Sequence, residues 1–404
     1  MKQVNVSFIG AGAFISATHL KTAGAADFIN IRAIAELDEK LLAEHCSKYD
    51  IGYTTNDYRQ LLEDPETDII VIGTKQELHA KLIVEALDAG KWVWCEKPMC
   101  ETQEEAEQIL AAEERNPGKL AIGFNRRFAP AYTAALTALK KRPRPWFVSY
   151  RVQMDNHQKK HDANNFYFHR PAIIYEGCHF IDLATFIFGE APGRVYMSGP
   201  ENAENDCVIL EYADGSRFQL LNTNTAGNGG LGKELAEFFA ADLALKVDNF
   251  VDFKLRGDYE NFDRIFPPAW GEFTEETLMY GYDFLETLRM KLAQPDRALN
   301  QHSTIAPVKR GYANRPYEAK IAEIYEEMKD MPWQQRVIQV DKGWEAAFQH
   351  FCKAFLDKSE PLNANGKSGK LANDIAFALL ESKKTKSPVD FYSENRGSFK
   401  DHQQ

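Results

Sequence analysis

Short apolar runs alternate with helix-forming stretches over the first 125 residues, and this alternation restricts the fold more than any other feature. The first run, 4–9, ends in a glycine-containing turn, GAGAF at 10–14, and helix-forming residues follow it. Later runs lie at 28–35, 68–73, 92–95 and 120–123. Repeated strand–helix units predict a parallel, doubly wound sheet, in which the binding site lies at the carboxyl ends of the strands.

The turn at 10–12 fits the start of a dinucleotide-binding Rossmann domain, which we place at residues 1–125. Gly10 permits the turn, Gly12 lets backbone N–H groups approach a pyrophosphate, and the helix N-terminus adds a favourable dipole. Position 15, usually Gly or Ala for close helix–strand packing, is Ile15, so we expect a slightly displaced helix. A GxG pattern alone is weak evidence for a dinucleotide site, and an ordinary strand–turn–helix unit is the alternative interpretation.

An acidic residue follows the second apolar run. Glu36 lies 24 positions after Gly12, near the spacing of an acid that binds a ribose 2′-hydroxyl. Its carboxylate would repel a 2′-phosphate, and the next residue, Leu37, offers no cation, so the pattern favours NAD over NADP. A solvated acid after a strand is the alternative interpretation of Glu36 and of Asp38.

Further polar residues fall just beyond the ends of predicted strands, where a doubly wound sheet binds its ligands. Together with the turn and the acid they form the predicted site for the cofactor, NAD. The predicted cofactor-binding residues are Gly10, Gly12, Ala13, Phe14, Glu36, Thr74, Glu96, Lys97 and Asn125.

Longer motifs accompany the glycine turn. They read TKQELHA at 74–80, CEKPM at 95–99, GFNRRF at 123–128 and EGCHFID at 176–182. With these motifs the chain resembles the Gfo/Idh/MocA family of NAD(P)-dependent oxidoreductases, in the branch of inositol and other sugar or polyol dehydrogenases. The resemblance covers roughly residues 1–256 and 341–392.

The resemblance implies that Lys97 and His179 act at the carbinol of the substrate. Hydride can leave a C–H bond only if the hydroxyl proton also leaves, so a base near neutral pKa is needed at that oxygen. His179 suits this role, and the Lys97 ammonium can orient the oxygen and stabilise a developing alkoxide. Without the flanking motif, His179 would be read as a core histidine, because its predicted helix, 173–188, is mostly apolar.

Many family members place an Asp four residues before this histidine, where this chain has Tyr175; Glu176 stands three before it. Positions three and four before a helical residue share its face. Glu176 could therefore orient the imidazole, which makes it the third predicted catalytic residue beside Lys97 and His179, and Tyr175 could stack on a sugar ring.

The resemblance also places Asn125 and Arg126 at substrate hydroxyls, whereas Arg127 more readily supports the fold. The loop at 167–171 lacks the glycines common in relatives, so sugar contacts there should differ. The predicted substrate-binding residues are Lys97, Asn125, Arg126, His169, Arg170, Tyr175 and His179.

A histidine group at 157–169 has spacing compatible with a metal. His157, His161 and His169 lie near Asp155, but the residues at 158–160 are Gln-Lys-Lys and no acidic partner has a fixed position. We expect polar histidines lining a sugar site and no metal.

Beyond residue 125 the pattern changes. Residues 126–404 are predicted to form an α/β substrate and oligomerisation domain, whose strand-like runs at 147–152, 206–212 and 216–221 predict a large, mainly antiparallel sheet. Relatives commonly pair through one face of this sheet, so the resemblance implies a homo-oligomer, a dimer or tetramer. An unmatched insertion at about 258–340 holds helical patterns at 274–294 and 317–331; it is either a packed α-hairpin or a lid over a glycan pocket.

Composition excludes several classes of protein. The net charge of −11, from 48 basic and 59 acidic residues, argues against nucleic-acid or anionic-membrane partners. No run approaches the roughly 20 apolar residues of a membrane helix. Six scattered cysteines without a CxxC pair, and a start that runs directly into a strand pattern, lead us to expect a cytoplasmic protein with reduced thiols.

Three functions are compatible with these patterns. The first is an NAD-dependent dehydrogenase that oxidises a secondary hydroxyl of a sugar, polyol or glycoside. The second is an NAD-requiring glycoside hydrolase or lyase, in which transient ring oxidation acidifies the adjacent C–H, elimination releases the aglycone and the hydride returns. The third is a non-catalytic regulator that senses the cofactor.

Overall fold

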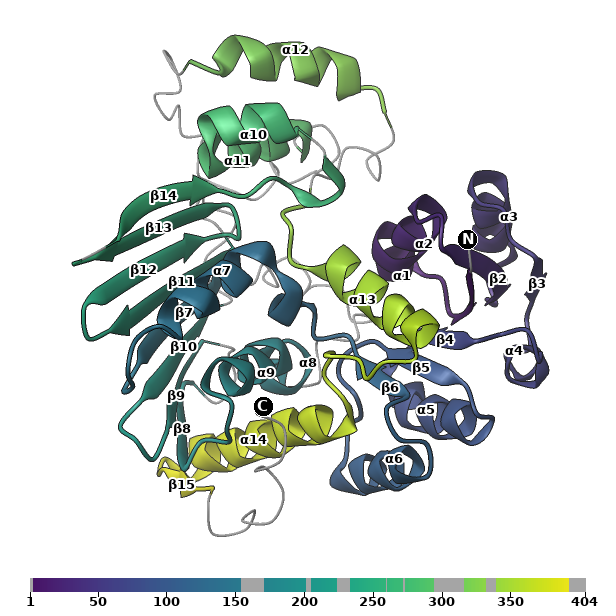
Figure 1. The fold of residues 1–404 in the computed structure, drawn as a ribbon, viewed down its shortest axis with the longest axis horizontal. Coiled ribbons are helices and arrows are strands. Elements are labelled where there is room, and N and C mark those ends of the chain that lie inside the picture. Colours follow the sequence, from purple (N-terminus) through teal and green to yellow (C-terminus); the bar gives the residue numbers. More distant parts are fainter. Residues whose placement is uncertain are drawn as a thin grey trace. The chain divides into compact units, whose positions relative to one another are not determined.

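The computed structural model describes most of the chain (Figure 1). The chain forms two compact units. Unit 1 comprises Met1–Ala129, Gln158–Leu220 and Gly343–Gln404, and unit 2 comprises Pro130–His157 and Leu221–Lys342. The domain limits predicted at 125 and at 258–340 stay predictions. The described residues are 3–153, 171–200, 205–223, 233–258, 260–271, 273–293, 316–331 and 339–391.

A six-stranded parallel sheet forms the N-terminal part of unit 1. Its strand order, β3-β2-β1-β4-β5-β6, is that of a doubly wound sheet and confirms the predicted Rossmann fold. Residue pairs Ile9↔Ile72 and Ile72↔Cys95 bring the carboxyl ends of β1, β4 and β5 level with one another. The strands are β1 Val4–Ile9, β2 Ile29–Ala35, β3 Tyr53–Thr55, β4 Ile69–Ile72, β5 Trp92–Cys95 and β6 Leu120–Ile122.

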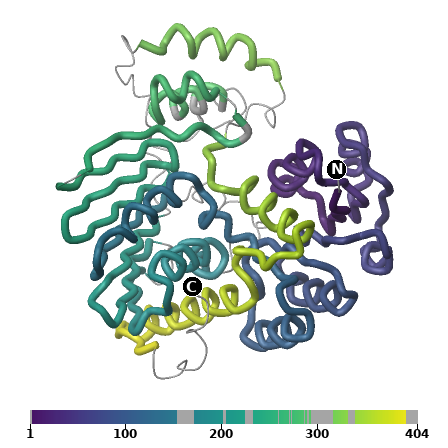
Figure 2. The backbone as a smooth tube through the Cα atoms, in the orientation of Figure 1, coloured from purple at the N-terminus to yellow at the C-terminus, as the bar shows by residue number. Residues whose placement is uncertain are grey.

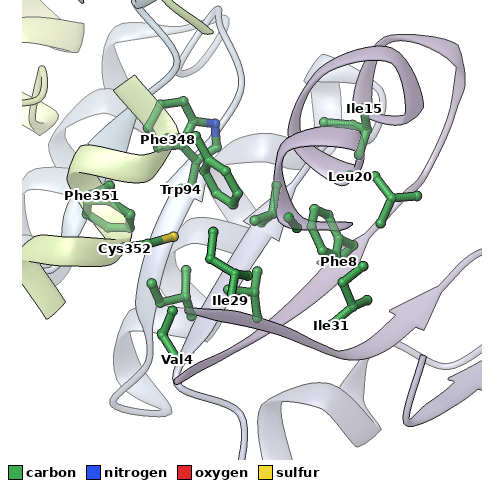
Figure 3. Packing of buried hydrophobic residues seen from close by; sticks show 14 of the residues in the cluster. Val4, Phe8, Ile15, Leu20, Ile29, Ile31, Trp94, Phe348, Phe351 and Cys352 are labelled. Carbon is green, nitrogen blue, oxygen red and sulfur yellow. The ribbon is translucent and has the colours of Figure 1, made fainter. Parts of the chain in front are cut away.

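Helices connect and cover these strands, as the alternation predicts. They are α1 Ala13–Ile15, the π-helical turn η1 Ser16–Leu20, α2 Lys21–Ala25, α3 Glu39–Lys48, α4 Arg59–Glu63, the 3-10 turn η2 Gln76–Leu78, α5 His79–Asp88 and α6 Gln103–Arg115. The helix α13 Trp344–Asp357, far along the sequence, also packs on this sheet. Its residues Phe348, Phe351 and Cys352 form one apolar core with Trp94 and with side chains of β1 and β2 (Figure 3). The backbone tube likewise brings α13 beside the N-terminal elements (Figure 2).

Ile15, the unexpected residue in the glycine turn, is accommodated by a glycine on the neighbouring strand. A Cβ atom on Gly73, which follows β4, would overlap the Ile15 side chain, so the missing Cβ makes room for Ile15. Directly after Ile15 the helix runs as a π-turn before α2 begins. The displacement of this helix expected from the sequence stays a prediction.

The second sheet has nine strands in the order β14-β13-β12-β11-β7-β10-β9-β8-β15, and the pairs described along it are antiparallel, as predicted. Buried and less buried residues alternate along strands such as β7. The strands are β7 Phe147–Gln153, β8 Arg194–Ser198, β9 Asp206–Glu211, β10 Arg217–Thr223, β11 Glu234–Ala240, β12 Leu243–Asp248, β13 Asp252–Gly257, β14 Asn261–Ile265 and β15 Val389–Asp390.

Within unit 1, α14 packs on β8, where the Ser382 hydroxyl accepts a hydrogen bond from the Met197 N–H at 3.1 Å. The remaining helices of unit 1 are the 3-10 turn η3 Asn125–Phe128, α8 Ala172–Tyr175, α9 Gly177–Phe188 and α14 Gly366–Thr385; unit 2 begins with α7 Pro130–Leu139.

The insertion contains the predicted helices, with the first pattern divided at Gly281. Its helices are the 3-10 turn η6 Ala269–Gly271, α10 Thr274–Tyr280, α11 Tyr282–Ala293 and α12 Glu318–Met328. Phe284 and Leu288 of α11 and Ile321 of α12 are buried, and the Tyr317 hydroxyl donates to Asp283. An antiparallel bridge between Pro268 and Val340 closes the two ends of the segment.

Replacing Gly73 by Ala should destabilise the protein by about 1–3 kcal/mol, because the new methyl overpacks against Ile15. In an Ile15→Ala background the same change should lose most of this effect, since the obstructing side chain is gone. Urea unfolding of the four proteins in this double-mutant cycle measures the coupling. Equal losses in both backgrounds would show that Ile15 and Gly73 do not compete for the same space.

Candidate active site

The predicted site residues that the structure describes lie within unit 1, on segments that follow strands of the Rossmann sheet and on the α8–α9 segment. Parallel strands bring the loops after their carboxyl ends to one edge, which explains why residues far apart in sequence meet there.

The peptide group of Ala11 in the glycine turn is held from both sides. Its N–H donates to Glu36 Oε2 at 2.9 Å, and its carbonyl oxygen lies 2.9 Å from Nε2 of the buried His45 on α3. Gly10 has a positive φ of 80°, which a glycine adopts without strain. Sequence reasoning missed His45; its one signal is a histidine in the last turn of a helix with a largely charged sequence.

Glu36 faces the turn, and its binding of a ribose hydroxyl stays a prediction. Its other carboxylate oxygen, Oε1, accepts the N–H groups of Leu37 at 2.7 Å and Asp38 at 3.2 Å, which holds the negative charge at the end of β2. Asp38 has a different role: it caps α3 by accepting from Lys40 N and Leu41 N. Of the two acids considered, Glu36 is therefore the one placed against the glycine turn.

The turn has the features that a dinucleotide requires. A Cβ on Gly12 would meet nothing within 4 Å, and Gly12 is the N-cap of α1, which has no side-chain cap. A pyrophosphate can approach this backbone and accept from the first helical N–H groups. Phe14, at the start of this helix, is 43% exposed and lies edge-on to Trp344 of α13, with ring centroids 6.1 Å apart. The residues present fit NAD.

Glu96, directly after β5, is buried and hydrogen-bonded from within the domain. Its Oε1 lies 2.6 Å from His19 Nε2 and accepts from Trp94 Nε1 at 3.2 Å. His19 belongs to the π-turn η1 and packs between aromatic rings, with centroids 5.0 Å from both Trp94 and Phe348. The sequence predicted Glu96 at the site and did not identify His19 as its partner.

Lys97 connects the Rossmann edge to the α8–α9 segment. Its ammonium Nζ donates to the Tyr175 carbonyl oxygen at 2.8 Å and lies 3.5 Å from Glu176 Oε2. The Lys97 and Glu176 side chains are 13% and 25% exposed, so this ion pair is partly shielded from water. Two residues predicted to be catalytic are thus brought into contact.

The continuous helix predicted over 173–188 is wrong: the segment is divided at Glu176 into α8 and α9. A continuous α-helix would pair the His179 N–H with the Tyr175 carbonyl. Here the His179 N–H donates to the Glu176 carbonyl at 3.2 Å, and the Tyr175 carbonyl accepts from Lys97 instead. The long-range bond to Lys97 therefore replaces one helical bond at the break.

Tyr175 and His179 are both buried. The Tyr175 hydroxyl donates to Glu101 Oε1 at 2.6 Å, so its polar end is held inside the domain. The His179 ring lies edge-on to Phe124 with centroids 6.0 Å apart. Orientation of the His179 imidazole by Glu176, and stacking of Tyr175 on a sugar, stay predictions.

Asn125 and Arg126 occupy the short turn η3 after β6, and both are buried. The Arg126 guanidinium lies 4.9 Å from the centre of the Phe180 ring on α9. Arg127 binds Asp182 of α9 through two hydrogen bonds of 2.9 and 2.5 Å. Burial raises the pKa of Asp182, and the Arg127 charge opposes that shift. Arg127 therefore ties η3 to α9, the structural role expected for it.

The predicted substrate residues His169 and Arg170 lie outside the described residues, as does the rest of the histidine group at 155–169. Among the residues that the structure does describe, no three His, Cys, Asp or Glu side chains are grouped so as to hold a metal ion. The helices described for this chain include none that is long and apolar enough to cross a membrane.

The fold and this edge cluster define an oxidoreductase built on a dinucleotide-binding domain. Residues 4–124 match the family described as "Oxidoreductase family, NAD-binding Rossmann fold", GFO_IDH_MocA. The uncharacterized oxidoreductase YrbE of Bacillus subtilis is 34% identical over 261 residues, which are 61% of this chain and 74% of that protein. The chain belongs to the Gfo/Idh/MocA family of NAD-binding oxidoreductases, as its motifs predicted.

Relatives with a stated activity are more distant. Levoglucosan dehydrogenase of Pseudarthrobacter phenanthrenivorans is 27% identical over 205 residues, 47% of this chain and 52% of that enzyme. Inositol 2-dehydrogenase 2 of Saccharopolyspora erythraea is 25% identical over 256 residues, 59% of this chain and 71% of that enzyme. An oxidoreductase from Agrobacterium radiobacter, solved with NAD+, L-tartaric acid and magnesium, shares the fold: its TM-score is 0.71 at 14% identity, over 97% of this chain and 99% of that one.

NAD(H) should bind at least about ten-fold more tightly than NADP(H), equivalent to about 1.4 kcal/mol, because the Glu36 carboxylate would repel a 2′-phosphate. Glu36→Gln should narrow this ratio by removing the charge. Isothermal titration with both cofactors measures the affinities. Glu39→Gln is the matched control, since it removes an exposed charge from the same segment, and should leave the ratio unchanged. Equal affinities of the unaltered protein for the two cofactors would contradict the assignment.

Proposed function

We propose that the protein transfers a hydride between a secondary hydroxyl of a sugar, polyol or glycoside and NAD. One observation carries this proposal: the Lys97 ammonium is bound to the Tyr175 carbonyl at the α8–α9 break and is ion-paired to Glu176. In the sequence, Tyr175 lies four residues before His179. A cation held in place and a base that accepts a proton are the two groups that oxidation of an alcohol requires.

Each side chain has a distinct proposed role. Lys97 donates a hydrogen bond to the substrate oxygen and stabilises the negative charge that develops on it. His179 accepts the hydroxyl proton. Glu176, ion-paired to Lys97, holds the ammonium in its orientation. NAD supplies the hydride acceptor.

The cofactor residues predicted from the sequence enter the proposal with specific tasks. The backbone of Gly10, Gly12, Ala13 and Phe14 holds the pyrophosphate, and Glu36 binds the adenosine ribose. The remaining members of the set line the edge of the sheet: Thr74, Glu96, Lys97 and Asn125. The openness of Gly12 and the placement of Glu36 against the turn support this arrangement.

Carbohydrate is the proposed substrate class. Two distant relatives are named as dehydrogenases of levoglucosan and of inositol, compounds with several hydroxyl groups. We assign substrate contacts to Lys97, Asn125, Arg126, His169, Arg170, Tyr175 and His179. A homo-oligomer is also proposed: Phe147 and Phe239 are large apolar side chains exposed on neighbouring strands of the second sheet, with ring centroids 6.2 Å apart.

The deciding experiment incubates the protein and NAD with a panel of sugars, polyols and glycosides, reading NADH and products together. Equal amounts of NADH and a ketone product establish the proposed reaction. Release of an aglycone without net NADH would establish instead a redox-neutral hydrolase or lyase. Cofactor binding with no product from any member of the panel would favour a cofactor-sensing regulator.

Lys97→Ala should lower the rate of hydride transfer by roughly 100-fold or more, since positioning and charge stabilisation are both lost, while NAD affinity changes little. Single-turnover measurements of NADH formation, with titration of NAD, separate the two effects. Lys81→Ala, which removes an exposed lysine from α5, is the control and should keep the normal rate. Survival of hydride transfer near the normal rate in Lys97→Ala would remove Lys97 from the mechanism.

If His179 is the base, the rate of oxidation should rise with pH, because only the neutral imidazole can accept the proton. His179→Asn cannot accept the proton, so it should lower the rate by about 100- to 10,000-fold and flatten this limb. Glu176→Gln should be milder, because its proposed task is to orient Lys97. The measurement is single-turnover hydride transfer against pH for all three proteins. An unchanged pH limb in His179→Asn would move the role of base to Glu176 or to another residue.

A further inference from the structure

A buried histidine lies between the two loops that carry predicted site residues after β4 and β5. His79, the first residue of α5, is 1% exposed. Its Nδ1 lies 2.8 Å from the Pro98 carbonyl oxygen, and its Nε2 lies 3.3 Å from the Thr74 carbonyl oxygen. Pro98 directly follows Lys97, so one ring contacts both the Lys97 turn and the predicted cofactor loop.

The two contacts are not equivalent, because a neutral imidazole carries one N–H and two carbonyl oxygens face it. A single proton can satisfy one of them. The shorter contact is the one to Pro98, which places the proton on Nδ1 and leaves the Nε2 lone pair towards Thr74 at the longer distance.

The neutral form is the one that its surroundings favour. Burial lowers the pKa of His79 below its ordinary value, and the positive charge of Lys97 lowers it further. The two carbonyl groups and Glu96 act in the opposite direction without reversing the shift. His79 is therefore a fixed hydrogen-bond donor to the Lys97 turn.

Other contacts hold the far end of the same turn. Asn373 of α14 donates to the Cys100 carbonyl at 3.1 Å, and the Glu101 N–H donates to Glu105 Oε2 at 2.8 Å. These bonds lie three and four residues after Lys97, whereas the bond from His79 reaches the adjacent residue. On the side that follows Lys97, the His79 bond is the nearest described hydrogen bond; on the preceding side, the Glu96 N–H donates to the Ile72 carbonyl at 3.0 Å.

We propose that His79 is a positioning residue that sets the place of the Lys97 ammonium through the Nδ1–H bond to the Pro98 carbonyl. The proposal rests on the catalytic role given to Lys97 above. Loss of the bond would let the turn shift, and displacements of about 1 Å can lower a rate about 100-fold. The effect should fall on the chemical step and leave NAD affinity nearly unchanged.

Two conservative variants separate the nitrogens. The amide nitrogen of Asn is joined to Cγ, as Nδ1 is, so His79→Asn can keep the bond to Pro98; the amide of Gln reaches only the Nε2 position. We expect His79→Asn to keep hydride transfer within about three-fold of the unaltered protein and His79→Gln to lower it at least ten-fold. A loss in His79→Asn as large as that in His79→Gln would overturn the proposal; rates are compared per NAD-binding protein, so incomplete folding of His79→Gln does not enter the comparison.

A double-mutant cycle with Lys97→Ala shows whether His79 acts through Lys97. If it does, His79→Gln should lower single-turnover hydride transfer strongly in the normal background and less than about two-fold beside Lys97→Ala. Leu87→Ala, at the other end of α5, is the control: it should lower the melting temperature and leave the rate of transfer unchanged.

The cycle also separates the two proposals. The same fold-loss from His79→Gln in both backgrounds, together with a large loss from Lys97→Ala alone, would overturn the role of His79 and keep that of Lys97. A Lys97→Ala protein with normal hydride transfer would overturn the role of Lys97, and the positioning role of His79 would fail with it.

Discussion

The hydrogen bond from the Lys97 ammonium to the Tyr175 carbonyl organises the candidate active site. It joins the turn after β5 to the α8–α9 segment, 78 residues further along the chain. The helix is divided at Glu176, where the Tyr175 carbonyl accepts from Lys97 and the His179 N–H donates to the Glu176 carbonyl. Helix geometry and site geometry are thus two aspects of one interaction.

Around this bond, buried polar groups are held by partners within unit 1. Glu96 is bound by His19 and Trp94, and the Arg127–Asp182 pair ties η3 to α9. Buried charges without partners are strongly unfavourable, so such pairs restrict the surrounding backbone to few arrangements. Polar groups held in place in this way are a condition for electrostatic stabilisation of a transition state.

Sequence reasoning selected residues by their chemical type together with their position relative to predicted strands and motifs. The Glu36 carboxylate lies against the glycine turn at the end of β2, and Lys97 of the EKP motif lies beside Glu176; the roles assigned to them stay predictions. It missed His19, His45 and His79, whose partners are 77, 34 and 19 residues away in the chain. A histidine on a helix gives no sign of which distant carbonyl or carboxylate it will meet.

By itself the sequence determined the parallel doubly wound sheet, the glycine turn, the antiparallel second sheet and the family, because periodicity and short motifs are local properties of a chain. Only the tertiary structure decided that the helix ends at Glu176, that Gly73 makes room for Ile15, and that Asp38 caps α3 while Glu36 faces the turn. Each of these outcomes depends on competition between local and distant partners for one backbone group or one volume. A local sequence pattern does not show which distant group will bind a given backbone group or fill a given volume. The folded structure shows it.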